Sequence, residues 1–284
     1  ANYDSTRETI KEFVNGSEGE IIFTKNSTES LNLVAHCFGK FLKEGDEIIL
    51  TEAEHHSNYV PWHFLRKKKV NIKFIPINEE GEVQVDQLTS LITNKTKMIS
   101  IIHVSNVTGL TTNVKKVISI ARAKKIPVCI DGTQAVTHSH VDLKELDCDF
   151  YVFSGHKMYG PTGIGVLYGR FEILDTLTPL LTGGEMIKRV SFDGTEFGSL
   201  PNRLEAGTPP ISAVIGLGAA IRFLQQHLTS EVKAHEAELL EYLQNQLRAL
   251  GDVHLYGAHR DNIGAVVFNL ADEHHQDVGI LLDQ

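Results

Sequence analysis

Residues 150–169 read FYVFSGHKMYGPTGIGVLYG, a stretch that leaves a buried strand, passes several glycines and enters a second strand. The aromatic and β-branched residues at its start predict a strand covered on both faces. Lys157 follows this strand directly, although lysine is seldom fully buried without a partner. The later glycines predict that residues 163–168 return as an antiparallel neighbour. We therefore expect an amine at the edge of a sheet, with a chemical partner close to it.

Outward from this stretch, short β-branched runs alternate with turns and helical patterns. This alternation is typical of an α/β fold, a mostly parallel sheet with helices on both faces. The predicted strands cover residues 20–24, 47–51, 71–75, 98–103, 127–131, 149–154, 163–168, 253–256 and 264–269. The predicted helices cover residues 27–41, 61–69, 86–91, 114–124, 212–226 and 232–250, and a last one begins near 275.

The chain divides near the end of the predicted helix at 212–226. We expect a large domain over residues 1–230 and the start of a smaller, incomplete domain over residues 231–284. Gly251 follows the long helix at 232–250 in the position of a C-terminal cap.

Composition excludes several classes of partner. Asp and Glu outnumber Lys and Arg by 36 to 27, so the formal net charge is −9 and nucleic acid is not expected. No apolar run approaches the roughly 20 residues of a membrane span, and the N-terminus lacks the layout of a signal peptide. Three cysteines without paired spacing disfavour a disulfide framework and a zinc ribbon. We expect a cytoplasmic protein with reduced thiols.

Two predicted strands end in residues that carry chemistry. Asp131 ends the run IPVCID, which places its carboxylate at the carboxyl edge of a parallel strand, where open α/β sheets bind ligands. On position alone, a cap for the next helix is the favoured interpretation of Asp131. Lys157 emerges at the same edge. The simplest alternative to a functional site is that the Lys157 amine and the Asp131 carboxylate form only an ion pair. Ser154 and His156 add a hydroxyl and an imidazole suited to a phosphate.

Other strand ends carry polar residues as well. In IIFTKNSTESLNLVA a strand leads into a helix whose N-terminus would face a ligand at the sheet edge. Ser27 or Thr28 capping that helix is the simpler alternative. His55 and Asn106 also follow strands. Thr, His, Asn, Asp and Lys at five strand ends together predict one functional site.

Four stretches of the chain are distinctive: DGTQAVTHSHVDLKELDCDFYVFSGHKMYGPTGIGVLYG, EHHSNYVPW, HVSNVTG and RLEAGTP. Together they resemble those of pyridoxal-phosphate-dependent cysteine desulfurases of the SufS/CsdA type, in the class V aminotransferase group. The similarity covers essentially the whole chain, and SGHKMYGPTGIG favours the SufS-like branch over the IscS-like one. The resemblance implies the fold of fold-type I transferases, which agrees with the predicted α/β class.

The resemblance assigns the catalytic and ring-binding residues. It implies that Lys157 bonds covalently to the aldehyde of pyridoxal 5'-phosphate and later acts as an acid–base catalyst. It implies that Asp131 pairs with the pyridine nitrogen, that Gln134 reaches the ring oxygen and that His55 stacks on the ring. A carboxylate beside the nitrogen keeps it protonated, and the protonated ring accepts electrons.

The resemblance also assigns residues to the phosphate and the substrate. It implies that Thr28, Ser154 and His156 hold the phosphate and that Asn106 orients the substrate carboxylate. Thr208, in EAGTP, is expected to reach the phosphate of a neighbouring subunit. A homodimer with composite active sites follows from this last expectation.

The implied activity is conversion of L-cysteine to L-alanine with transfer of sulfur as a persulfide to an acceptor protein, for iron–sulfur cluster assembly. L-selenocysteine is a second candidate substrate. Such chemistry needs an accessible, acidic thiol. Cys37, Cys129 and Cys148 lie in or beside predicted core elements and suit packing better. We expect the sulfur-accepting cysteine to lie beyond Gln284, in a C-terminal segment, and an N-terminal stretch also to be missing.

Two alternatives remain open at this stage. The chain could be another class V aminotransferase or lyase, or a non-catalytic protein that holds the cofactor or relays sulfur if the downstream cysteine is truly absent. The histidine pairs at 55–56 and 274–275, with the His-Ser-His at 138–140, raise the question of a metal. No cysteine or carboxylate accompanies them at a ligand spacing, so we expect no metal site.

Overall fold

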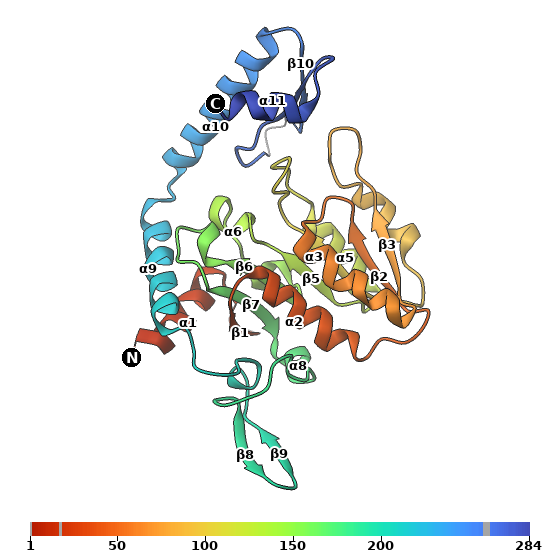
Figure 1. Ribbon diagram of the computed structural model, residues 1–284, viewed down its shortest axis with the longest axis vertical. Helices are drawn as coiled ribbons and strands as arrows, with labels where there is room; N and C mark the ends of the chain where they lie inside the picture. The colour runs from red at the N-terminus through yellow and green to blue at the C-terminus, as the bar shows by residue number, and fades with distance from the viewer. Residues whose placement is uncertain (1, 17–18, 258–261) are drawn as a thin grey trace.

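The structure is a computed structural model that describes residues 2–16, 19–257 and 262–284. Its main element is a mixed sheet with helices on both faces, and a smaller unit follows it (Figure 1). The strands are β1 Gly19–Thr24, β2 Glu47–Thr51, β3 Asn71–Ile75, β4 Thr96–Ile102, β5 Val128–Asp131, β6 Phe150–Ser154, β7 Gly165–Arg170, β8 Ile187–Ser191, β9 Gly194–Phe197, β10 Val253–Tyr256 and β11 Val267–Leu270. The helices are α1 Asn2–Phe13, α2 Ser27–Gly39, α3 His56–His63, α4 Leu88–Leu91, α5 Val114–Ala123, α6 Ala135–His138, α7 Leu143–Leu146, α8 Phe171–Leu174, α9 Ile211–His227, α10 Ser230–Ala249 and α11 His275–Leu282, with 3-10 turns at Phe64–Lys68, Val85–Gln87, Gly155–Lys157 and Asn202–Leu204.

The main sheet has the order β1-β7-β6-β5-β4-β2-β3 within the described residues. Pairs from β6 through β3 are parallel, whereas β7 pairs antiparallel with both β6 and β1. The predicted parallel α/β sheet with an antiparallel β7 is confirmed. Because β1, β2, β4, β5 and β6 run in the same direction, the loops after them leave from one edge of the sheet.

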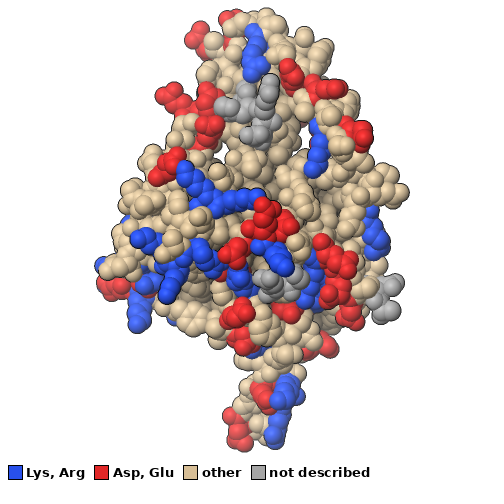
Figure 2. Space-filling model, turned by 180° about the vertical axis from the view of Figure 1, so that it is seen from behind, with Lys and Arg blue, Asp and Glu red and all other residues tan. Residues whose placement is uncertain are grey.

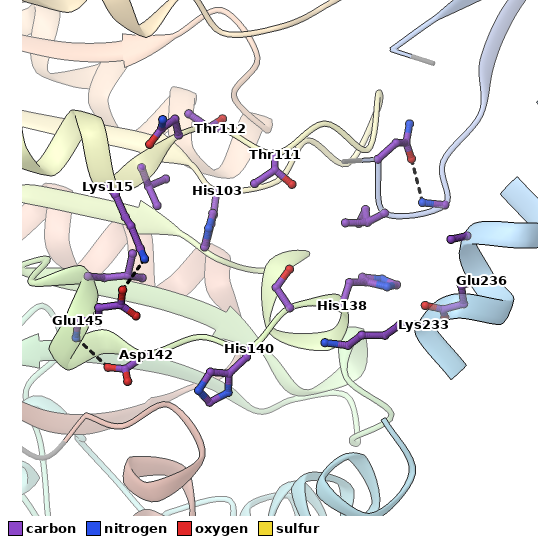
Figure 3. A pocket seen from close by; sticks show the side chains of 18 residues that line it. His103, Thr111, Thr112, Lys115, His138, His140, Asp142, Glu145, Lys233 and Glu236 are labelled. Carbon is purple, nitrogen blue, oxygen red and sulfur yellow. Dashed lines mark hydrogen bonds and ion pairs between the residues drawn. The ribbon is translucent and has the colours of Figure 1, made fainter. Parts of the chain in front are cut away.

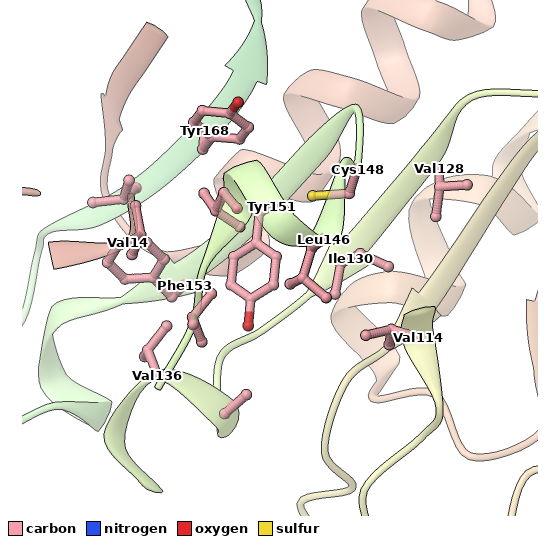
Figure 4. Close-up of a cluster of buried hydrophobic side chains, with 14 of the residues drawn as sticks. Val14, Val114, Val128, Ile130, Val136, Leu146, Cys148, Tyr151, Phe153 and Tyr168 are labelled. Atoms are coloured by element: carbon pink, nitrogen blue, oxygen red, sulfur yellow. The ribbon is translucent and has the colours of Figure 1, made fainter. Parts of the chain in front are cut away.

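Two buried clusters cover the two faces of the sheet. Along β6, Tyr151 and Phe153 belong to one cluster, with α1, α5 and α9, while Phe150 and Val152 belong to the other, with α2 and α3. Side chains alternate between the faces of a strand, so both faces of β6 are apolar and buried. Figure 4 shows part of the first cluster, where the Tyr151 ring lies among its apolar neighbours.

Glycines determine how closely the chain packs after β6. A Cβ on Gly165, the first residue of β7, would lie 2.4 Å from the Asn26 Cα. A Cβ on Gly155 would lie 2.7 Å from the Ile164 side chain, and Gly155 N donates to Ile164 O. The glycines in this stretch therefore permit tight folding of the backbone behind Lys157, as the sequence predicted.

One predicted helix is wrong at its start. The sequence predicts a helix from Pro61, but α3 begins at His56 and contains Pro61. Its first turn is held from outside the helix, because the buried Asn58 side chain donates to Glu54 and accepts from Trp62 and Ser100. These tertiary contacts outweigh the local preference of proline for a helix start. The helix α1 at Asn2–Phe13 and the hairpin β8–β9 were not predicted.

The C-terminal region lies apart from the main sheet in Figure 1. It consists of α10, the antiparallel pair β10 and β11, and α11. The expected cap of α10 is present, since Gly251 follows the helix with a φ of 88°. The boundary between two domains at residue 230 stays a prediction.

The surface carries charges of both signs. Figure 2 shows Lys and Arg side chains interspersed with Asp and Glu on one face. None of the helices among the described residues is long and apolar enough to cross a membrane.

Candidate active site

A cavity of about 190 Å³ lies at the carboxyl edge of the main sheet. The loops after β1, β2, β4, β5 and β6 all contribute to its walls. It is lined by every sequence-predicted site residue except Thr208, namely Thr28, His55, Asn106, Asp131, Gln134, Ser154, His156 and Lys157. The direction of the five strands thus brings together side chains that are as many as 129 positions apart, from 28 to 157.

Lys157 reaches the cavity from the 3-10 turn that follows β6. Its side chain and that of His156 are exposed, while the backbone beneath them is held in place. The Thr137 hydroxyl donates to Lys157 O at 2.6 Å, and Gly160 N donates to Gly155 O at 2.9 Å. A rigid backbone below an exposed amine leaves the amine free to react in the cavity.

Asp131 is a buried carboxylate on the cavity wall, at 3% exposure. Burial raises its pKa, and the hydrogen bonds from Thr133 N and Thr133 Oγ1 together with the nearby His55 oppose this rise. Both of those hydrogen bonds go to Oδ1, so Oδ2 accepts none among the described residues. The site therefore holds a desolvated carboxylate that a cation would stabilise.

Three hydroxyls connect the loops around the N-terminus of α2. Ser27 N donates to Ser154 Oγ at 2.7 Å, and the Ser27 and Ser154 hydroxyls are 2.8 Å apart. Thr133 Oγ1 lies 2.6 Å from Ser27 Oγ, within hydrogen-bonding distance. The helix cap itself is Asn26, whose side chain accepts from Glu29 N, so the capping alternative for Ser27 and Thr28 is wrong. Both residues are left to line the cavity.

His55 is held at a fixed angle by Ser57. Ser57 N donates to His55 Nδ1 at 3.1 Å, and the Ser57 hydroxyl bonds the Thr28 hydroxyl at 2.7 Å. Because Nδ1 accepts from an N–H, the neutral imidazole carries its proton on Nε2. Ser57 was not among the predicted site residues, although it lines the cavity.

Glu54 supports the cavity from behind and was also missed. Its carboxylate accepts hydrogen bonds from Thr51 Oγ1, Asn58 Nδ2 and Ile102 N, at 2.7, 2.7 and 2.9 Å. These bonds join the loop after β2 to the end of β4. Burial raises the pKa of Glu54 to about 8. The only sequence signal was a carboxylate next to His55, directly after the predicted strand at 47–51.

Thr208 lies elsewhere, in a second cavity of about 660 Å³. The wall of that cavity includes Glu205, which pairs with Arg7 at 2.8 Å and accepts from Phe23 N at 2.6 Å. Within a single chain the structure does not bring Thr208 to Lys157. The expectation that it serves a neighbouring subunit stays a prediction.

The three cysteines are buried and free. Burial raises the pKa of the Cys37 thiol to about 11 and that of Cys148 to about 12, and it also raises the pKa of Cys129. Their assignment to packing agrees with this burial, because a nucleophilic thiol needs exposure and a lowered pKa. In the described part of the chain, no group of three His, Cys, Asp or Glu side chains is arranged to hold a metal ion.

These residues can hold a planar heterocycle. The buried carboxylate of Asp131 suits a cationic ring nitrogen, and the His55 imidazole suits the face of the ring. Hydroxyls and the N-terminus of the 13-residue helix α2 suit an anionic group such as phosphate. The Lys157 amine is the nucleophile of the set, able to bond a carbonyl carbon.

Comparisons with known proteins find relatives over nearly the whole chain. The chain is 46% identical to a probable cysteine desulfurase of Staphylococcus epidermidis over 99% of its length, and covers 69% of that relative. It is 43% identical to a cysteine desulfurase of Wigglesworthia glossinidia brevipalpis over its full length, and covers 70% of that protein.

Solved structures show the same fold. The cysteine desulfurase CsdA of Escherichia coli superposes with a TM-score of 0.91 at 36% identity, over 99% of this chain and 71% of that one. A cysteine desulfurase of Thermococcus onnurineus gives a TM-score of 0.93 at 38% identity, with the same coverage. A model of the aminotransferase class-V family matches residues 1–284, and the chain therefore belongs to this family.

Proposed function

We propose that this protein is a pyridoxal-phosphate-dependent cysteine desulfurase that converts L-cysteine to L-alanine and passes the sulfur on as a persulfide. The observation that carries the proposal is the shared cavity of Lys157 and the buried Asp131, delivered by the adjacent parallel strands β6 and β5. Relatives at 43 and 46% identity bear the name cysteine desulfurase.

The cavity provides a partner for each functional group of pyridoxal phosphate. Lys157 would bond the aldehyde carbon, and Asp131 would accept a hydrogen bond from the protonated pyridine nitrogen through Oδ2. Gln134 would donate to the ring oxygen, and His55 would stack on the ring. Thr28, Ser154 and His156 would surround the phosphate at the N-terminus of α2.

Asp131 sets the charge of the site. The cofactor supplies, when bound, an electron sink for the negative charge that develops on the substrate Cα. A buried carboxylate is unstable alone, and a cation beside it lowers its pKa again. Asp131 would therefore hold a proton on the pyridine nitrogen, and Thr133 keeps the carboxylate oriented.

Lys157 moves protons at the substrate. Its amine lies on an ordered turn at the cavity wall, where it can take a proton from the substrate Cα and return one to the carbon that becomes the alanine methyl group. Asn106, exposed on the same wall, would bind the substrate carboxylate. His55, oriented by Ser57, would contribute to catalysis by fixing the ring between its imidazole and Asp131.

Sulfur transfer needs a thiolate that attacks the substrate sulfur, which yields L-alanine and a persulfide. None of the three cysteines of this chain has the exposure for this role. We infer that the accepting thiol is another one, and that a sulfur-acceptor protein receives the sulfur. A contribution to iron–sulfur cluster assembly and use of L-selenocysteine follow from the resemblance. A cytoplasmic location is supported by three free cysteines.

A homodimer is part of the proposal. The hairpin β8–β9 extends away from the rest of the chain in Figure 1, and all of its residues are exposed. Its base is joined to the segment before Thr208, because Gly207 N donates to Gly184 O at 3.0 Å. A second chain that covers the hairpin would therefore also meet Thr208, as the composite active site requires.

The test uses protein purified with an excess of pyridoxal phosphate. We expect a visible absorption band from the bound cofactor. With a thiol reductant present, which can accept the sulfur in place of a protein thiol, we expect formation of L-alanine from L-cysteine. Lys157→Ala should lose the band and lower the rate by roughly 10³-fold or more, since it removes both the covalent bond and the proton transfer. Lys116→Ala, an exposed lysine on α5, is the matched control.

The outcomes separate the alternatives. A colourless protein without cofactor would reject the assignment. A band without alanine formation would favour another class V aminotransferase or lyase if some other amino acid reacts. A band without any reaction would favour a protein that only holds the cofactor or relays sulfur.

A further inference from the structure

Asn262 is a buried residue, 9% exposed, that joins the C-terminal region to the loop at 105–110. Its Nδ2 lies 2.6 Å from Thr108 O, 2.8 Å from Ala265 O and 3.0 Å from Gly257 O, so its two hydrogens are shared among three carbonyl oxygens, of which Thr108 O is the nearest. Its Oδ1 accepts from Gly264 N at 2.8 Å and from Ala265 N. One amide side chain thus orders its own turn and bonds a carbonyl in the loop after β4.

The C-terminal region and the loop at 105–110 lie close together along their backbones. Ile263 N donates to Gly109 O at 3.0 Å, next to the bond from Asn262. A Cβ on Gly109, whose φ is 72°, would lie 2.4 Å from Asn262 Oδ1. A Cβ on Gly257 would lie 3.2 Å from the Thr108 backbone carbonyl oxygen. Glycines therefore permit the two segments to approach at backbone distance.

The loop that Asn262 bonds is the one that carries Asn106. Ser105 Oγ accepts from Val107 N and Thr108 N at 3.2 Å each, and Gly109 N donates to Ser105 O at 3.0 Å. These bonds join Ser105 to Val107, Thr108 and Gly109, so a shift of Thr108 would be transmitted to Asn106, which lies between Ser105 and Val107.

Beside this contact the two parts of the chain are separated by a hollow. A cavity of about 630 Å³ is lined by His103, Thr111 and His138 on one side and by Lys233 and Glu236 of α10 on the other (Figure 3). Asn262 and Ile263 lie at its border. The loop is also contacted by Gly81, where a Cβ would lie 2.8 Å from the Thr108 side chain, and Asn262 adds a hydrogen bond from the C-terminal region.

We propose that Asn262 is a positioning residue that holds Asn106 toward the substrate through the Thr108 carbonyl. The inference rests on the proposed function, in which Asn106 binds the substrate carboxylate. It assigns to the C-terminal region a part in amino-acid binding without any contact to the amino acid.

The experiment uses protein loaded with pyridoxal phosphate and two readouts. Hydrogen–deuterium exchange of a peptide covering residues 105–110 reports on the loop, and titration with L-alanine, followed by cofactor absorbance, gives an apparent Kd. Asn262→Ala should speed exchange of the loop and raise the Kd about tenfold, the size of one net hydrogen bond. Cofactor absorbance without L-alanine should not change.

Two further variants sharpen the result. Asn262→Asp keeps the oxygen that Gly264 N and Ala265 N require but cannot donate to Thr108 O. It should therefore speed loop exchange and raise the Kd as Asn262→Ala does. If Asn262→Ala does not fold, the Asn262→Asp result tests the inference. Asn269→Ala removes an exposed asparagine of the same region, bonded to Tyr256, and should leave both readouts unchanged.

Unchanged loop exchange or an unchanged Kd in the Asn262 variants would overturn the inference. The proposed function has a separate check in Asn106→Ala, which should raise the Kd for L-alanine. If it does not, the substrate role of Asn106 is wrong. A failure of the substrate role of Asn106 can be distinguished from a failure of the positioning role of Asn262, because hydrogen exchange of the loop does not depend on what Asn106 binds.

Discussion

At the scale of single residues, Gly165 shows how the site limits the choice of side chain. It begins β7 where the strand passes the backbone of Asn26, the cap of α2. A Cβ there would meet two backbone atoms of Asn26 at 2.4 and 2.5 Å. A flexible side chain could move away, but the backbone of a helix cap cannot move without shifting the N-terminus that lines the cavity.

Gly165→Ala should lower the free energy of unfolding by about 2 kcal/mol, as overpacking of a tight contact does. It should also weaken pyridoxal phosphate binding, because Ser27 and Thr28 follow the cap directly. Urea unfolding and a cofactor titration measure the two effects. Gly194→Ala, in β9 with open space around it, should change stability by less than about 0.5 kcal/mol. Equal effects in both variants would contradict the steric argument.

At the scale of elements, His103 joins the end of β4 to β6. Its Nδ1 lies 2.8 Å from the Tyr151 hydroxyl, and a Cβ on Gly132, just after β5, would lie 2.0 Å from the Tyr151 ring. The ends of three adjacent strands are thus packed on one tyrosine. Burial lowers the pKa of His103 to about 4, so the folded protein holds this imidazole neutral.

The shift predicts a dependence of stability on pH. Above pH 6.5 His103 is neutral in both the folded and the unfolded chain. As the pH falls from 6.5 to 4, only the unfolded chain takes up the proton, and the folded state loses stability, at most about 3 kcal/mol. In His103→Gln, the decrease in the free energy of unfolding that protonation of His103 causes between pH 6.5 and 4 should be absent.

Urea unfolding of the cofactor-free protein at pH 7.5, 6 and 5 measures this dependence. His275→Gln, an exposed histidine at the start of α11, should retain the wild-type profile. A wild-type profile in His103→Gln would show that the imidazole is not held neutral by burial.

At the scale of the whole molecule, the β8–β9 hairpin is the segment that most needs a partner. Phe192 at its tip is fully exposed and Val190 is 60% exposed. An isolated two-stranded hairpin is marginally stable in water, and exposed apolar side chains favour association. The proposed homodimer would provide the cover and would place Thr208 where two chains meet.

Val190→Ser combined with Phe192→Ser should weaken the dimer at least tenfold, by loss of buried apolar area. Sedimentation equilibrium gives the dissociation constant directly. Phe41→Ser, at another exposed aromatic residue, is the control and should leave the constant unchanged. Retention of full dimerisation by the double variant would mean that the hairpin does not lie in the interface.

Much of the main domain could be predicted from sequence because its signals are local. Consecutive residues encode the strand from Phe150 to Ser154 and the turn at Lys157. They also encode the helix caps at Asn26 and Gly251, although the first cap was predicted at Ser27 or Thr28. α3 was misplaced because contacts of Asn58 with distant side chains start it, and these have no local signature.

The sequence by itself determined the α/β class, the antiparallel return after Lys157 and the residue types at each strand end, since these depend on neighbouring residues. Only the tertiary structure decided which strand ends share a cavity, that Glu54 lies behind His55 with a raised pKa, and that Asn262 bonds the Asn106 loop. Strand order, burial and contacts between distant segments create these properties, and no stretch of consecutive residues contains them.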